Sequence, residues 1–292
     1  MKVAAIGEAM IELSIDGDSA SVGVAGDTLN TAIYLKRCAP DLHVDYVTRL
    51  GVEPFSNKIA DFIAAQGVGT AAIERDPDGT PGLYAITTDA EGERSFTYWR
   101  DAAAARSVFM GDDAPDFSGL AGYDVLYLSG ISLAILPHAT RLALIEWLAE
   151  FRGGGGRVVY DSNYRPRLWE DAATARAVNA QLWALSDIAL PSIDDEQAMT
   201  GETGEEVAQR FGAIGRTGAL KRGPVGPLCL QTGTSGQYAA ATRVVDTTAA
   251  GDSFNGAYLG AVLTGQDQAT ALRAGHDLAA RVIGHKGAIL PA

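Results

Sequence analysis

The stretch VLYLSGISLAILPHATRLALIEWLAEFRGGGGRVVYD, residues 125–161, contains two apolar runs separated by a helical segment. Val125–Ser129 is continuously apolar apart from its last residue, as expected of a strand that is buried on both faces of a parallel sheet. Residues 137–151 are predicted to form a helix, which the glycines of residues 153–156 end. Residues 158–161 form the next short strand. The order of strand, helix and strand predicts a βαβ unit.

The same alternation continues on both sides of this unit. Further strands are predicted at residues 3–6, 44–48, 188–190 and 244–245, and further helices at residues 28–38, 54–66, 172–184, 252–263 and 268–283. Strands that alternate with helices favour a three-layer α/β fold with a mostly parallel central sheet. No Pro-, Gly- or Ser-rich linker divides the chain, so we expect one domain over residues 1–292.

One region breaks this rhythm. Residues 82–88 and 94–100 are rich in Tyr, Thr, Ile and Phe, and residues 89–93 between them include Gly92. This pattern predicts an antiparallel hairpin, and the alternating residues 10–24 are its expected neighbour in space. We therefore expect a small β lid, built from residues 10–24 and 80–106, that covers a site or forms an oligomer contact.

The charge balance excludes several classes of partner. The chain has 292 residues with 36 acidic and 23 basic side chains, which gives a formal net charge of −13. Nucleic-acid binding begins with neutralisation of phosphates, and anionic membranes attract basic segments, so neither partner is expected. An anionic substrate must instead be bound by a few local arginines and backbone amides.

The remaining composition predicts a cytoplasmic protein. Cys38 and Cys229 could form one disulfide, although two buried free thiols in a reducing compartment are the favoured interpretation. The four histidines are never closer than nine positions, a spacing that predicts no zinc site. The first residues lack the apolar core of a signal peptide, and no apolar run approaches the roughly 18 residues that would span a bilayer.

The segment DTTAAGDSFNGAYLG, residues 246–260, carries the strongest chemical signal. A turn of Thr, Ala and Gly leads into a helix, whose free N–H groups and positive dipole end attract an anion. Asp252 could simply cap this helix, since Asp favours that position. An acid inside an anion hole is better explained as a general base that takes a proton from a hydroxyl during phosphoryl transfer.

This segment resembles the C-terminal signature of the ribokinase-like (PfkB) carbohydrate kinases. AGDTLNTAIYL, residues 25–35, is similar to the first signature of the family, although Ala25 replaces its usual first glycine. The resemblance covers essentially the whole chain and implies a ribokinase-like fold. It also implies that Asp252 is the catalytic base, that Ala249, Ala250 and Gly251 form the anion hole, and that ATP and Mg²⁺ are cofactors.

Within the family, the strings PGLYAIT, FTYWR and NYRPRLW resemble members that phosphorylate the 6-hydroxyl of 2-keto-3-deoxy-D-gluconate. An arginine fork suits the carboxylate of such a sugar acid, and tyrosine hydroxyls can orient it. Taken singly, the tyrosines could be ordinary cross-strand aromatics and Arg100 a solvated charge at a sheet edge. The substrate residues that the resemblance implies are Gly26, Asp27, Asn30, Tyr84, Tyr98, Arg100, Ile131, Arg165 and Asp252.

The resemblance also implies a nucleotide site and two ion sites. The Gly-rich loop KRGPVG, residues 221–226, is either a phosphate loop or a surface turn. The implied nucleotide residues are Asn163, Arg165, Lys221, Gly223, Gly226, Ala249, Gly251 and His276. Asp195 and Glu196 are candidates for ordering Mg²⁺ through water, although Ser192 replaces the asparagine of the family's Asn-x-x-Glu segment and an acidic helix start is the alternative. Asp246 and Thr248 are candidates for a monovalent cation such as K⁺.

Other functions fit the sequence less well. A dinucleotide-dependent oxidoreductase needs G-x-G-x-x-G after its first strand, and a P-loop kinase needs G-x-x-x-x-G-K-[ST]; the chain has neither. Fructokinase and ribokinase remain alternatives within the family, and they differ in needing no arginine for a substrate carboxylate. A non-catalytic sugar-acid sensor is the alternative outside enzymes, but it would not need Asp252. The expected partners are a sugar acid, ATP and, through the β lid, a second copy of the chain.

Overall fold

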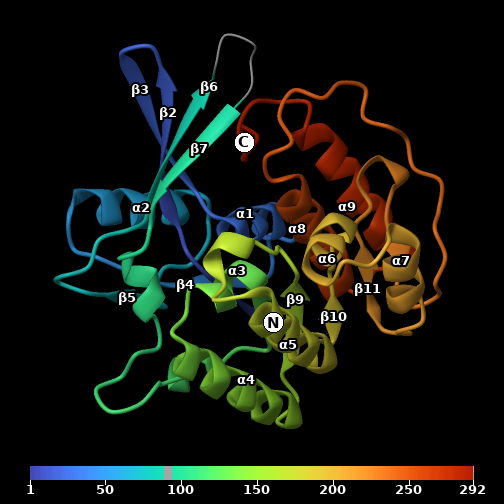
Figure 1. The fold of residues 1–292 in the computed structure, drawn as a ribbon, viewed down its shortest axis with the longest axis horizontal. Coiled ribbons are helices and arrows are strands. Elements are labelled where there is room, and N and C mark those ends of the chain that lie inside the picture. Colours follow the sequence, from blue (N-terminus) through green and yellow to red (C-terminus); the bar gives the residue numbers. More distant parts are fainter. Residues whose placement is uncertain (89–93, 292) are drawn as a thin grey trace.

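The computed structural model describes residues 1–88 and 94–291, which are arranged as helices on both faces of an eight-stranded sheet (Figure 1). The strand order is β12-β11-β10-β9-β8-β1-β4-β5, in which β12 runs antiparallel to β11 and the other neighbours run parallel. The strands of this sheet are β1 (Lys2–Ile6), β4 (His43–Leu50), β5 (Ile73–Arg75), β8 (Val125–Ser129), β9 (Arg157–Asp161), β10 (Ile188–Ala189), β11 (Thr217–Leu220) and β12 (Leu228–Cys229).

The helices were predicted well where their apolar pattern is long. The segments at 28–38, 54–66, 137–151, 172–184, 252–263 and 268–283 all form helices within two residues of the expected bounds, whereas α3 and α7 were not predicted. The start of α6 was the alternative interpretation of the acidic cluster, and it is confirmed, because Asp195 and Glu196 lie in the first turn of this helix. The helices are α1 (Asp27–Cys38), α2 (Pro54–Ala65), α3 (Gly130–Ala134), α4 (His138–Gly153), α5 (Ala172–Leu185), α6 (Ile193–Thr200), α7 (Gly204–Gly212), α8 (Ala250–Leu263) and α9 (Gln268–Val282).

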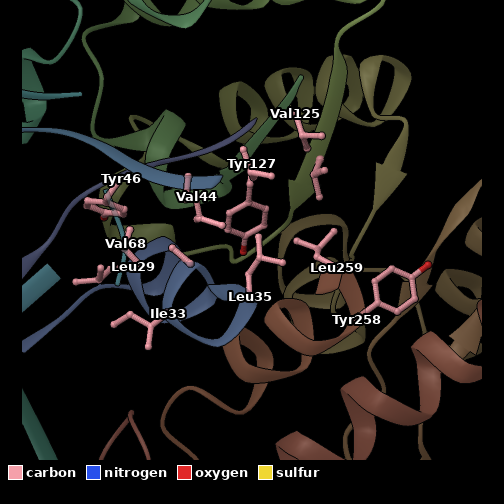
Figure 2. Packing of buried hydrophobic residues seen from close by; sticks show 14 of the residues in the cluster. Leu29, Ile33, Leu35, Val44, Tyr46, Val68, Val125, Tyr127, Tyr258 and Leu259 are labelled. Atoms are coloured by element: carbon pink, nitrogen blue, oxygen red, sulfur yellow. The ribbon is translucent and has the colours of Figure 1, made fainter. Parts of the chain in front are cut away.

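Burial of both sheet faces explains the continuous apolar strands. Val125 and Tyr127 of β8 pack with α1, α2, α8 and α9, while Leu126 and Leu128 of the same strand pack with α3, α4 and α5. Figure 2 shows the first of these layers, where Leu35 of α1 and the side chains around it meet strand residues. Because successive strand residues point to opposite faces, both must be apolar, and the predicted three-layer α/β fold is confirmed.

A second sheet of four strands forms the lid, with the order β3-β2-β6-β7. Its strands are β2 (Met10–Asp16), β3 (Ser19–Ala25), β6 (Leu83–Thr88) and β7 (Arg94–Trp99), and they extend away from the main sheet (Figure 1). The predicted hairpin and its pairing with residues 10–24 are confirmed, since β6 pairs with β7 and also with β2. The predicted turn at residues 89–93 lies outside the described residues.

Two sequence predictions were wrong. Residues 244–245 do not form a strand: Val244 and Val245 are exposed, and the amide of Val245 donates to the carbonyl of Ile283, so no neighbouring strand pairs with them. Both cysteines are free thiols as expected, but Cys38 is exposed and only Cys229 is buried. Cys38 is the last residue of α1, where the helix emerges from the core. Among the described residues, no helix is long and apolar enough to cross a membrane.

The strand order also fixes where a ligand can bind. From β1 the chain proceeds toward β4, whereas from β8 it proceeds in the opposite direction toward β9 and β10. Such a reversal leaves a crevice outside the carboxyl ends of the strands, which is the usual ligand site in open α/β sheets. The lid strands lie on this same side: β2 and β3 follow β1 along the chain, and β6 and β7 follow β5.

Candidate active site

A cavity of about 1180 Å³ lies between the lid and the carboxyl ends of the main sheet. This volume exceeds the range of about 300–1,000 Å³ that is usual for a single small ligand, so it suits two substrates. It brings together nearly all the residues that the sequence analysis selected. The predicted residues that line it are Gly26, Asp27, Asn30, Tyr84, Tyr98, Arg100, Ile131, Asn163, Arg165, Asp195, Lys221, Gly223, Thr248, Ala249, Ala250, Gly251, Asp252 and His276.

Asp252 lies in the first turn of α8, but it does not cap the helix. The N-cap position belongs to Ala249, which adopts a left-handed conformation with φ 60°, and no side chain caps this end. The carboxylate of Asp252 instead accepts a hydrogen bond of 2.9 Å from Asn30 Nδ2 of α1. The capping alternative is therefore wrong, and Asp252 is available to a ligand in the cavity.

The surroundings of Asp252 raise the pKa of its carboxyl group to about 8, mainly through burial and then through the nearby charge of Asp27. A carboxyl group with this pKa is poised to exchange a proton near neutral pH. Asn30 opposes the shift by donating to the charged form. The geometry thus gives a buried, hydrogen-bonded acid beside the small-residue turn.

Lys221 adds a positive charge to this end of the cavity. Its Nζ donates to Asp161 Oδ1 at 2.7 Å and lies 3.7 Å from the point where a Cβ on Gly251 would be. Asp161 is itself held by Asn255 Nδ2 at 2.6 Å. The amide of Ala250 donates to the Thr247 carbonyl at 3.2 Å, whereas the next first-turn amides, of Gly251 and Asp252, have no intrahelical acceptor, so the Lys221 ammonium group lies near backbone N–H groups that an anion can use. This arrangement favours a phosphoryl group.

Asp27 and Gly26 form the floor beside α1. Asp27 accepts hydrogen bonds from Ser129 Oγ at 2.5 Å and from Asn163 Nδ2 at 2.6 Å, which join three segments of the sheet edge. Gly26 is needed for close packing, because a Cβ there would overlap the backbone oxygen of Glu8. These contacts fix the Asp27 carboxylate in one position, and a fixed carboxylate can orient a hydroxyl group of a ligand.

The lid supplies the opposite wall. Tyr84 and Tyr98 stack with their ring centroids 5.6 Å apart, and the Tyr84 hydroxyl donates to Glu12. Arg100 lines the cavity and is also paired with Glu8, which is almost fully buried. The alternative of a solvated edge charge is therefore wrong for Arg100, whose residue is 8% exposed.

Arg165 and Asp195 both line the cavity and lie side by side. Arg165 follows the carboxyl end of β9, is half exposed, and approaches Asp195 Oδ1 with its Nη1 at 3.3 Å. Burial and the neighbouring Asp161 raise the pKa of Asp195. Asp195 stands three positions after Ser192, where the family's Asn-x-x-Glu segment has its glutamate.

Three predicted residues do not line the cavity. Glu196 points away from it and accepts from Arg210 Nη2 at 3.0 Å, and burial raises its pKa to about 7. Asp246 closes its own turn, with Thr248 Oγ1 at 2.6 Å and the amide of Gly287 at 2.9 Å as donors. Gly226 lies behind the loop against Tyr238, at a positive φ of 84°. His276 does line the cavity and contacts the Tyr238 ring.

Sequence reasoning missed Glu8 and Asp161. Each acid lies at or just after the carboxyl end of an apolar strand, β1 or β9, and this position was the available signal. Among the described residues, no cluster of three or more His, Cys, Asp or Glu side chains could hold a metal ion. A divalent ion bound here would therefore need ligands from a phosphate or water in addition to Asp195.

Comparison with known proteins agrees with this geometry. The description "pfkB family carbohydrate kinase" matches residues 1–292. A 2-dehydro-3-deoxygluconokinase of Dickeya dadantii (strain 3937) is 44% identical over 99% of this chain and 96% of its own length, whereas a fructokinase of Vibrio alginolyticus is 26% identical over 87% and 80%. The crystal structure of a PfkB protein from Polaromonas sp. JS666 has a TM-score of 0.80 at 26% identity, covering 96% of this chain and 94% of that one. The match over the whole chain shows that this protein belongs to the pfkB family of carbohydrate kinases.

Proposed function

We propose that the chain transfers the γ-phosphoryl group of ATP to the 6-hydroxyl of 2-keto-3-deoxy-D-gluconate, which is also called 2-dehydro-3-deoxy-D-gluconate. The observation that carries the proposal is Asp252, a buried acid beside a helix N-terminus in a cavity that four arginines also line, Arg100 and Arg165 among them. The relative that shares 44% identity over nearly the whole of both chains supports this choice of substrate.

In the proposed reaction, the carboxylate of Asp252 takes the proton of the 6-hydroxyl. The freed oxygen then attacks the γ-phosphorus, and the bond from that phosphorus to the β,γ-bridging oxygen breaks, so that ADP leaves with the bonding electrons. Charge on the phosphoryl oxygens is stabilised by Lys221 and by amides of this helix start other than that of Ala250, which already donates to the Thr247 carbonyl. Asn30 orients the base through its hydrogen bond to Asp252.

The sugar end of the cavity supplies recognition of the acid. Arg100 and Arg165 come from segments far apart in sequence, yet both line the same cavity. A guanidinium group binds a carboxylate with two parallel hydrogen bonds, which a neutral sugar cannot form. Gly26, Asp27, Tyr84, Tyr98 and Ile131 complete the proposed sugar pocket.

We place the nucleotide at the opposite end. Asn163, Arg165, Lys221, Gly223 and His276 line this part of the cavity together with Ala249 and Gly251, and Gly226 supports the loop from behind. Residues 231–249 contain no strand, and the last three of them, Thr247, Thr248 and Ala249, line the cavity. The family implies ATP as phosphoryl donor and a divalent metal ion.

Mg²⁺ is the divalent ion that we propose, and Asp195 is its proposed protein partner. Carboxylate oxygens suit this hard cation, which usually keeps several waters and binds substrate phosphates. When bound, the ion neutralises charge on the phosphate oxygens. Glu196 is not proposed as a partner, because its carboxylate is held by Arg210. K⁺ near Asp246 and Thr248, association through the lid and a cytoplasmic location all stay predictions.

Fructokinase or ribokinase activity is the alternative within the family, and a sugar-acid sensor is the alternative outside enzymes. A coupled assay of ADP release with 2-keto-3-deoxygluconate, fructose and ribose separates the three. We expect the highest kcat/KM with the sugar acid. Faster turnover of fructose or ribose would favour the alternatives within the family. Absence of turnover with all three sugars would contradict the proposal that the chain phosphorylates any of them.

A further inference from the structure

Glu8 is a deeply buried charged side chain close to the cavity, although Glu8 itself does not line the cavity. It lies two residues after the end of β1 and is 1% exposed. Its Oε2 accepts from Arg100 Nη2, while its Oε1 has no hydrogen-bond partner among the described residues. A buried carboxylate is costly unless it is paired, so its retention at this position calls for a role.

The place of Glu8 in the fold suggests that role. The lid is connected to the main body by four strand ends, and all four meet around this residue. Glu8 itself precedes β2, and Arg100 follows β7. Gly26 follows β3 and packs on the Glu8 backbone oxygen, while Gly82 precedes β6 and packs on Glu8 Oε1; a Cβ on either glycine would overlap these atoms. The root of the lid is thus built around one carboxylate.

We propose that Glu8 is a positioning residue that fixes the guanidinium of Arg100 for the carboxylate of a sugar acid and so helps determine substrate choice. The proposal rests on the function proposed above, since it concerns the same substrate. Arg100 presents itself to the cavity while one of its nitrogens is held from behind.

The physical reason is the freedom of a long side chain. A free arginine loses rotamer entropy when a ligand fixes its side chain. Glu8 fixes Arg100 before the substrate arrives, so the sugar acid does not have to do so. A guanidinium group has five N–H donors, and the bond to Glu8 uses only one nitrogen, Nη2, so donor capacity beyond that bond is left for a ligand.

The test is Glu8→Gln, which keeps the shape but removes the charge. A charge-assisted hydrogen bond exceeds a neutral one by about 1–1.5 kcal/mol, so KM for 2-keto-3-deoxygluconate should rise about 5- to 10-fold. The kcat, the KM for ATP and the KM for 3-deoxy-D-fructose, the neutral counterpart with a hydroxymethyl group in place of the carboxylate, should each change less than about twofold. A merely structural role would alter all of these together.

A double-mutant cycle shows whether Glu8 acts through Arg100. In the Arg100→Met background, Glu8→Gln should raise KM for the sugar acid by less than about twofold. Asp187→Asn is the matched control, because Asp187 also pairs with an arginine, Arg152, but does so away from the cavity. This control should leave every KM unchanged. If Glu8→Gln fails to fold, Gly82→Ala would place a Cβ 2.3 Å from Glu8 Oε1 and 3.2 Å from the Cβ of Arg100, so it disturbs the pair without removing charge and should give the same acid-selective rise.

Three results would overturn the proposal: an unchanged or lower KM for the sugar acid, an equal rise for the neutral sugar, or a full effect of Glu8→Gln in the Arg100→Met background. Failure of the underlying function is distinguishable, because the unmodified protein would then show no preference for the sugar acid over 3-deoxy-D-fructose.

Discussion

The two ends of the cavity are built in different ways. Asp252, Lys221 and the Ala249–Gly251 turn lie at the end of the cavity where we propose phosphoryl transfer, called the phosphoryl end below. All three belong to the main body, and the positive groups there include backbone amides at the start of α8. At the sugar end, the lid wall consists of side chains on a four-stranded sheet with a partly exposed aromatic face, on which Tyr98 is 48% exposed. The comparison suggests that the body carries out the transfer and the lid selects the acceptor.

Each end nevertheless contains a cation held by a buried acid. Lys221 is bound by Asp161, and Arg100 by Glu8. In both pairs the acid lies at or just after the end of a strand of the main sheet, β9 or β1; Asp161 itself lines the cavity, whereas Glu8 does not. The same device therefore presents a positive charge to a phosphoryl group at one end and, in our proposal, to a substrate carboxylate at the other.

The largest effect is expected from breaking the phosphoryl end. Asp252→Asn should lower kcat by about 10²–10⁴-fold for acidic and neutral acceptors alike, because the proton of the hydroxyl then has no acceptor. Steady-state kinetics with ATP and sugar binding measured in parallel would show retained binding. Asp171→Asn is a control, since Asp171 caps α5 through the amide of Thr174. A kcat above about a tenth of the original for Asp252→Asn would argue against a base.

A smaller and selective effect is expected at the sugar end. Arg165→Ala should lower kcat/KM for 2-keto-3-deoxygluconate by about 10- to 150-fold, the loss of one charge-assisted contact worth about 1.5–3 kcal/mol. The loss with 3-deoxy-D-fructose should be much smaller. Because Arg165 is also a proposed nucleotide residue, KM for ATP is measured in the same variant. Equal losses for both sugars together with a raised KM for ATP would assign Arg165 to the nucleotide alone.

The pH profile sharpens the comparison further. A base must be deprotonated to act, and burial raises the pKa of Asp252 to about 8. The kcat/KM should therefore fall about tenfold per pH unit as the pH drops below that value, and level off above it. The profile should have the same shape for the acidic and the neutral sugar. A flat profile between pH 6 and 8, with chemistry shown to limit the rate, would contradict the assignment.

The smallest effect concerns the lid. Amide hydrogen exchange in β6 and β7 should slow by a few-fold when the sugar acid binds, because a lid that closes over the sugar excludes water. Strands β8 and β9 of the main sheet serve as the internal reference and should not change. Unchanged exchange in both lid strands would leave them a purely structural or oligomer-forming role.

The sequence predicted most of this arrangement because its signals are local. The buried strands are continuously apolar, and the turn before α8 has an unusual composition. The sequence prediction was wrong where the structure or role of a residue depends on which other segments or side chains lie beside it in the fold. Val244 and Val245 resemble a strand but have no strand beside them, and Glu196 resembles an ion ligand but has Arg210 beside it. The role of Glu8 depends on four strand ends that meet only in the fold.

The most direct test of the account is one ratio measured on the unmodified protein: kcat/KM for 2-keto-3-deoxygluconate divided by kcat/KM for 3-deoxy-D-fructose. Both sugars offer the same 6-hydroxyl to Asp252 and differ in the group that Arg100 and Arg165 would bind. With at least one charge-assisted contact to the carboxylate, the ratio should be about 10 to 150 or higher. A ratio near one, or one that favours the neutral sugar, would contradict the proposed sugar-acid kinase.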